Sequence, residues 1–420
     1  MSAPTTSNLG RPAHGVGDRF RSWWNALSRP AQWGIGIPFI FLIALLPIIR
    51  IPVLTTVGTD FGTVMAQFGM YALIAIGLNV VVGQAGLLDL GYVGFYAVGA
   101  YTVALLTSPN SPWNQTGDGG WLSAKWAWLA VLPLAVAITS LSGLLLGSPT
   151  LRLRGDYLAI VTLGFGEIVR LLADNLDTIT GGGQGLSQIA FPRVGESESR
   201  PAGIFSTGNL GDIDGGFWTS HLNSGVWWFW LSIVLIVIVL MFVGNLERSR
   251  VGRAWVAIRE DEDAAEIMGV PTFRFKLWAF VIGAAIGGLS GALYAGQVQF
   301  VIPTNFNVIN SVLFLCAVVL GGQGNKLGVI LGAFIIVYLP NFFLGRTDLF
   351  GIPINGNNIA EFKYLFFGLA LMTLMIFRPQ GLLPVRQKLL ALGRQIYLAA
   401  RRRPEETLGV ADPGDRGGMK

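Results

Sequence analysis

Long apolar stretches separated by short polar segments dominate the sequence from Trp33 to Phe377. An α-helix rises 1.5 Å per residue, so about 20 apolar residues cross the ~30 Å hydrocarbon layer of a bilayer. Most of the stretches approach that length, although the eighth and tenth are short. The pattern predicts an all-α polytopic membrane protein with about ten transmembrane helices, over Trp33–Ile49, Phe61–Val82, Gly86–Thr107, Trp126–Gly147, Tyr157–Ala173, Val226–Gly244, Leu277–Gly296, Val308–Gly322, Leu327–Leu344 and Phe362–Phe377.

The composition excludes a set of soluble domains. Charged residues make up 13% of the 420 residues, about half of the roughly 25% usual in soluble domains. A soluble protein of this length needs a charged surface around its core, and this chain cannot supply one. The apolar stretches are therefore interpreted as membrane spans.

Lysine and arginine predict the orientation, because they are enriched in cytoplasmic loops. If the amino terminus is cytoplasmic and all ten segments cross, most of the 29 lysines and arginines fall on the inner side. Arg170 then lies inside a span. The outer side holds only Arg50, Lys125, Arg193, Arg200, Arg346 and Lys363. Both termini are therefore predicted to be cytoplasmic.

The same topology divides the chain into three parts. Residues 1–32 form a cytoplasmic amino-terminal segment and 33–377 the transmembrane domain, which includes an outer loop at 174–225 and an inner loop at 245–276. Residues 378–420 form a cytoplasmic tail. The end of this tail is rich in charge, glycine and proline, so the tail is predicted to be disordered.

Residue usage argues against an enzyme. Cys316 is the only cysteine, which excludes a disulfide framework and a thiolate metal site. His14 and His221 lie far apart in the sequence, so no metal is expected. The chain contains no Gly-Lys dipeptide and therefore no phosphate-binding loop that ends in Gly-Lys-Ser/Thr. No cofactor is expected in this chain.

Three charged residues fall within the predicted spans: Asp89, Glu167 and Arg170. A charge at mid-bilayer costs about 2.5–3.5 kcal/mol on insertion scales, so none should face lipid. Glu167 and Arg170 are three residues apart and can pair on one helix face. The pair can be a self-neutralised structural element or can serve gating or translocation. Asp89 lies near the inner end of its span, where solvent or a helix terminus can satisfy it.

Gly283, Gly287 and Gly291 recur at every fourth position of one span. This small-xxx-small pattern lets another helix approach closely. Simple bundle packing explains the pattern, and sliding of helices during a transport cycle is the functional alternative.

Two glycine-glutamine hairpins resemble each other. Val82-Gly83-Gln84-Ala85-Gly86 follows the second span, and Gly321-Gly322-Gln323-Gly324 follows the eighth. Both are predicted on the inner side, as a remote internal repeat would place them.

The inner loop contains a helical sequence from Ser249 to Gly269, and its last part, Glu260–Gly269, is predicted to be a short amphipathic helix. Ala264, Ile267 and Met268 can form a small apolar face, and Gly269 is expected to end the helix in a left-handed conformation. Such a helix fits a groove in a partner protein. The alternative is a surface helix that lies on its own bundle or on lipid.

Several motifs in this sequence resemble one family. Asp263-Ala264-Ala265-x-x-x-Gly269 is similar to the Glu-Ala-Ala-x-x-x-Gly coupling motif of ABC importer permeases, with Asp in place of Glu and without the Ile-x-Leu-Pro that often follows. The LivM-type permeases of branched-chain amino acid importers carry signatures that resemble the remaining motifs, which are Leu153–Arg170, Gly77-Leu78-Asn79, Thr180-Gly181-Gly182-x-x-Gly185 and Phe377-Arg378-Pro379-Gln380-Gly381-Leu382.

The resemblance implies a subunit of a bacterial cytoplasmic-membrane importer for leucine, isoleucine and valine. Its partners would be a second, related permease, two cytoplasmic ATPases that bind the ATP, and an external substrate-binding protein. No nucleic acid is expected as a partner. The ATPases would contact the inner loop at Glu260, Asp263, Ala264, Ala265, Ile267, Met268 and Gly269.

Two other functions stay open at this level. The first is a permease subunit for urea or a short amide, whose family shares much of this pattern of motifs. A secondary transporter or a channel would need coupling groups or a selectivity filter within the membrane. A requirement for an ATPase partner would eliminate this last class.

Overall fold

The computed structural model describes residues 38, 43–48, 59–113, 127–152, 156–194, 203–206, 224–344, 348–349, 352–353, 362–377 and 381–382. The chain divides into two units, Met1–Pro52 and Val53–Lys420. The predicted first span, Trp33–Ile49, lies in the first unit and mostly outside the described residues, as do most of 1–32 and of 378–420. The following description concerns the second unit.

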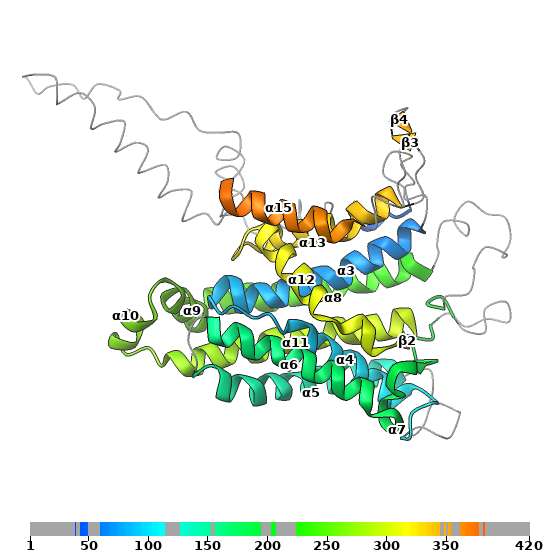
Figure 1. Ribbon diagram of the computed structural model, residues 1–420, viewed down its shortest axis with the longest axis horizontal. Coiled ribbons are helices and arrows are strands. Elements are labelled where there is room, and N and C mark those ends of the chain that lie inside the picture. Colours follow the sequence, from blue (N-terminus) through cyan, green and yellow to red (C-terminus); the bar gives the residue numbers. More distant parts are fainter. Residues whose placement is uncertain are drawn as a thin grey trace, which may run out of the picture. The chain divides into compact units, whose positions relative to one another are not determined.

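This unit is built almost entirely of helices (Figure 1). They are α3 (Phe61–Leu78), the π-helical turn η1 (Asn79–Gln84), α4 (Tyr92–Thr107), α5 (Ala127–Thr150), α6 (Asp156–Asn175), α7 (Asp177–Thr180), the 3-10 turn η2 (Gly182–Gln184), α8 (Ser224–Arg248), α9 (Arg250–Glu260), α10 (Glu262–Ile267), α11 (Thr272–Val298), the 3-10 turn η4 (Pro303–Phe306), α12 (Val308–Gly321), α13 (Lys326–Phe343) and α15 (Lys363–Phe377).

Four two-residue strands complete the described elements. β1 (Leu186–Ser187) pairs antiparallel with β2 (Phe300–Val301), and Leu186 lies opposite Val301. β3 (Asp348–Leu349) pairs antiparallel with β4 (Ile352–Pro353). These short pairs connect loops and leave the architecture all-α.

Every predicted span after the first corresponds to a helix, although α11 begins at Thr272, five residues before the predicted Leu277, and the start of the third span differs more. The third was predicted from Gly86, but α4 begins at Tyr92, because Gly86 has a φ of +73° that ends the preceding helical turn. The described helices long and apolar enough to cross a bilayer are Phe61–Gln84, Ala127–Thr150, Ser224–Arg248, Thr272–Val298 and Lys326–Phe343. Shorter apolar helices add to them, so the chain is a polytopic, all-α membrane protein.

Helix α11 lies at the centre of the packing, against α4, α5 and α3. Most of its residues from Gly283 onward are buried. The Tyr92 hydroxyl donates a hydrogen bond to the Gly283 carbonyl at 2.7 Å, and the Ser290 hydroxyl donates one to the Met70 carbonyl at 2.9 Å. These bonds satisfy polar side chains inside the bundle, where no solvent can.

Segments predicted on the same side of the membrane contact one another. On the predicted inner side, the Asn79 side chain meets Gly324, and Gln84 meets Glu247. On the predicted outer side, the Ser108 hydroxyl donates to the Ser187 carbonyl at 2.6 Å. In Figure 1, α9 and α10 accordingly lie at one end of the helices and α7 and β2 at the other.

Candidate functional site

The inner loop forms two helices, α9 and α10, and α10 corresponds to the short helix predicted at Glu260–Gly269. Ser249 caps α9 by accepting a hydrogen bond from the Val251 amide, and Asp261 caps α10 by accepting one from the Ala264 amide. Asp261 has an extended backbone that breaks the helix (φ −157°, ψ 110°), which places Glu260 at the end of α9. The predicted start of the short helix at Glu260 was wrong, because an aspartate is favoured as a helix cap over a position inside a helix.

Two contacts attach this pair of helices to the bundle. The buried Trp255 indole of α9 donates a hydrogen bond to the Phe275 carbonyl of α11 at 2.7 Å. Lys276 of α11 forms an ion pair with Glu262 of α10 at 2.5 Å. Both α9 and α10 are therefore connected to the first turns of α11.

The face of α10 that points away from the bundle exposes apolar side chains. Ile267 is 85% exposed and Met268 83% exposed, and Ala264 is also exposed, while Ala265 is buried against the chain itself. Asp263 and Glu266 are exposed beside them. Exposed apolar side chains on a projecting helix are typical of a surface that a partner covers.

Gly269 ends α10 in the predicted left-handed conformation, with a φ of +84°. Its amide donates to the Glu266 carbonyl at 2.9 Å, and the Val270 amide donates to the Ala265 carbonyl at 3.0 Å. These two bonds form the Schellman motif that satisfies the last carbonyls of a helix. A Cβ at Gly269 would meet no atom within 4 Å, so the left-handed backbone conformation, rather than lack of space, disfavours a side chain here.

The segments around the two glycine-glutamine hairpins contact each other, and α9 contacts the first of them. The Asn79 side-chain oxygen accepts a hydrogen bond from the Gly324 amide at 2.8 Å. Arg259 of α9 donates to the Gly83 carbonyl. Burial lowers the pKa of the Arg259 guanidinium, and Glu260 partly offsets the shift by raising it.

Glu247 connects the same hairpins from the end of α8. Its carboxylate accepts a hydrogen bond from the Gln84 amide and forms an ion pair with Lys326 at 2.6 Å. We call this set the inner junction; it consists of Asn79, Gly83, Gln84, Glu247, Arg259, Gly324 and Lys326. Sequence reasoning identified the two similar hairpins but not their contact or the residues that join them.

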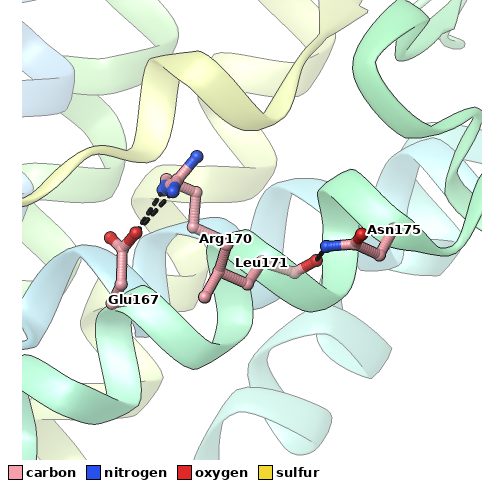
Figure 2. A network of polar contacts seen from close by, with 4 residues as sticks. All are labelled: Glu167, Arg170, Leu171 and Asn175. Atoms are coloured by element: carbon pink, nitrogen blue, oxygen red, sulfur yellow. Dashed lines mark hydrogen bonds and ion pairs between the residues drawn. The ribbon is translucent and has the colours of Figure 1, made fainter.

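The predicted pairing of Glu167 and Arg170 is confirmed (Figure 2). Both lie on α6, and Arg170 donates from Nε and Nη2 to the same carboxylate oxygen, Oε1. Their side chains remain partly exposed. The pair is therefore neutral as a unit, but its own bundle does not enclose it.

Asp89 is buried in the turn before α4, outside any helix. Its Oδ1 accepts a hydrogen bond from the Gly91 amide at 2.9 Å, while Oδ2 has no hydrogen-bond partner among the described residues. The sequence left two ways to stabilise the Asp89 carboxylate, which were contact with solvent and contact with a helix terminus. The carboxylate contacts the start of α4 and is buried from solvent. The amino-terminal end of α4 favours a negative charge there.

The glycines of α11 pack against neighbouring helices, as predicted. A Cβ at Gly291 would lie 2.1 Å from the Tyr96 carbonyl oxygen of α4. At Gly287 it would lie 3.2 Å from the Tyr92 ring, and at Gly283 it would lie 2.4 Å from Val81. Close helix contact thus requires small residues along this face.

The described residues contain no group of three or more His, Cys, Asp or Glu side chains that could hold a metal ion.

Comparison with known proteins gives one consistent family. Residues 61–375 match the family described as branched-chain amino acid transport system / permease component. The chain is 40% identical to the high-affinity branched-chain amino acid transport system permease protein LivM of Escherichia coli (strain K12), over 84% of this chain and 76% of that protein. No solved structure matches the chain.

More distant relatives carry similar names. A probable branched-chain amino acid transport permease protein LivM of Methanocaldococcus jannaschii is 26% identical over 76% of this chain and 92% of that protein. The permease protein LivH of Escherichia coli (strain K12) is 26% identical over 63% of this chain and 79% of its own. With a family match over most of its length and a relative at this level of identity, the chain belongs to the permease components of branched-chain amino acid transport systems.

Proposed function

We propose that the chain is the membrane-spanning permease subunit of an ABC importer that moves leucine, isoleucine and valine across the bacterial cytoplasmic membrane. The observation that carries this proposal is the 40% identity to LivM, which extends over 84% of the chain. The chain itself is not an enzyme. ATP is bound and hydrolysed by separate subunits, in keeping with the lack of a phosphate-binding loop in this sequence.

Ten helices cross the membrane in this proposal, with both termini cytoplasmic. The distribution of lysine and arginine supports this orientation, because the inner loop 245–276 and the tail carry most of the basic residues. The contacts between segments of the same predicted side are consistent with it.

Helix α10 is the contact with the ATPase. It projects from the inner end, carries exposed Ala264, Ile267 and Met268, and is attached to the bundle through Trp255 and Lys276. A second permease subunit and an external binding protein complete the complex. The similarity of this chain to both LivM and LivH proteins supports a pair of related permeases.

Competition for uptake tests the substrate. Cells that lack their own leucine importers would express this chain with its partner subunits and take up radiolabelled leucine. Unlabelled isoleucine and valine should compete with the label, whereas urea and short amides should not. Uptake of radiolabelled urea, with no uptake of leucine, would establish the urea permease function instead.

A further inference from the structure

The Glu167–Arg170 pair lies at the edge of a helix face that the described bundle leaves open. The exposed apolar residues of α6 on that face are Tyr157, Ile160, Val161, Ile168, Leu171 and Leu172. The side chains of Arg170 and Glu167 are themselves 22% and 34% exposed. Charges with this exposure within a membrane span are disfavoured against lipid, so water or another subunit must meet them.

The pair leaves part of its hydrogen-bonding capacity unused. Both bonds from Arg170 converge on Oε1 of Glu167. Within the part of the chain that the structure describes, Oε2 of Glu167 and Nη1 of Arg170 have no hydrogen-bond partner. Figure 2 shows the two groups side by side above the helix. One free acceptor and one free donor, of opposite charge, are therefore adjacent.

Both residues lie towards the predicted outer end of α6. Asn175 ends the helix, and Glu167 lies about 12 Å from it at 1.5 Å per residue. α6 also packs against η4, whose backbone is not α-helical. Irregular backbone at membrane depth is tolerated where protein buries it or where it lines a water-filled cavity. The non-helical backbone next to α6 is therefore compatible with a passage that opens to the outside.

We propose that Glu167 and Arg170 form a transient binding site for the zwitterionic backbone of the transported amino acid, on the outer half of a passage between α6 and the second permease. The site rests on the proposed function, because a zwitterionic substrate is part of it. The substrate ammonium binds Glu167, and its carboxylate binds Arg170 as a charge-assisted pair. Two ion pairs replace one, so no charge is left uncompensated when the substrate arrives or leaves.

Neutral variants of the pair test the site in the complete complex. Proteoliposomes would contain both permeases, both ATPases and enclosed ATP, with leucine-loaded binding protein outside. The double variant Glu167→Gln/Arg170→Gln removes both charges of the ion pair together and leaves neither uncompensated, so the complex should assemble as the wild type does. Leucine uptake should fall at least about tenfold, because contacts to charged groups are lost. Asn175→Ala, which removes only a bond to the Leu171 carbonyl, should leave uptake unchanged.

A second measurement does not depend on removing the charges. Leu171→Cys in a Cys316→Ala background should react with a membrane-impermeant thiol reagent from outside, and leucine-loaded binding protein should slow the reaction during turnover. Wild-type uptake by the double variant, or labelling that leucine does not change, would overturn the site alone. A wild-type complex that imports no leucine would overturn the proposed function together with the site.

Discussion

At the scale of single residues, glycine sets how closely α4 and α11 approach. Gly291→Ala would place a methyl group 2.1 Å from the Tyr96 carbonyl oxygen and 2.8 Å from the Ala100 amide nitrogen. Both obstacles are backbone atoms, so the helices must separate, at a cost of about 1–3 kcal/mol. The thermal unfolding midpoint of the purified chain in detergent should therefore fall.

Gly368→Ala is the matched control for this variant. Gly368 lies within α15, and a Cβ there would meet no atom within 4 Å. Alanine is favoured over glycine inside a helix by about 0.5–1 kcal/mol, so the midpoint should stay constant or rise. An equal fall in both variants would show that close packing at Gly291 is not the cause.

Arg259 gives a second prediction at this scale. Its guanidinium donates to the Gly83 carbonyl within the inner junction. Arg259→Met keeps a stem of similar length but removes the donor, which should destabilise the chain by about 1–3 kcal/mol. Arg253 on the same helix is exposed, so Arg253→Met should leave the unfolding midpoint unchanged. Equal midpoints for the two variants would contradict a structural role of the junction.

At the scale of elements, α10 is predicted to transmit to the membrane helices the conformational change that ATP hydrolysis drives in the ATPase. Gly269→Asp would strain a φ of +84° by about 1–2 kcal/mol, and Ala264→Arg would place a charge in the exposed apolar face. Both variants should insert normally but lose leucine uptake and bind or stimulate the ATPase weakly. Pull-down of the ATPase and uptake assays measure this, with Arg253→Met as control. Normal uptake by both variants would exclude α10 as the coupling element.

The helices were predictable because their apolar length is a local property of the sequence. The cap at Gly269 and the pair Glu167–Arg170 were predictable for the same reason, since each depends on residues within one turn. The cap at Asp261 was missed, although the residue is a good cap, because the surrounding sequence also favours a helix. The start of α4 at Tyr92 was missed because Gly86 leaves the helical conformation within an apolar segment.

The inner junction could not be derived from sequence patterns. Its hydrogen bonds join residues that are far apart, such as Asn79 with Gly324 and Gln84 with Glu247. No periodicity within a helix specifies which distant partner a buried amide will meet. The resemblance between the two hairpins was the available signal. It predicted an internal repeat but did not predict that the two hairpins contact each other.

At the scale of the whole molecule, the orientation in the membrane can be measured directly. Thr178 and Met268 are exposed at opposite ends of the helices. Cysteine substitutions at these positions, in a Cys316→Ala background without the ATPases, should react with an impermeant reagent from opposite sides. Thr178→Cys should be labelled in intact cells and Met268→Cys only after disruption of the membrane. Labelling of both positions in intact cells would contradict the proposed topology.

Leucine uptake driven by enclosed ATP tests the central claim most directly. Proteoliposomes would contain either the complete complex or this chain with the second permease alone, with leucine-loaded binding protein outside. Accumulation of leucine should require the ATPases and hydrolysable ATP, because this chain has no phosphate-binding loop of its own. Leucine uptake by the permeases alone, without ATP, would contradict the account and identify a secondary transporter or a channel.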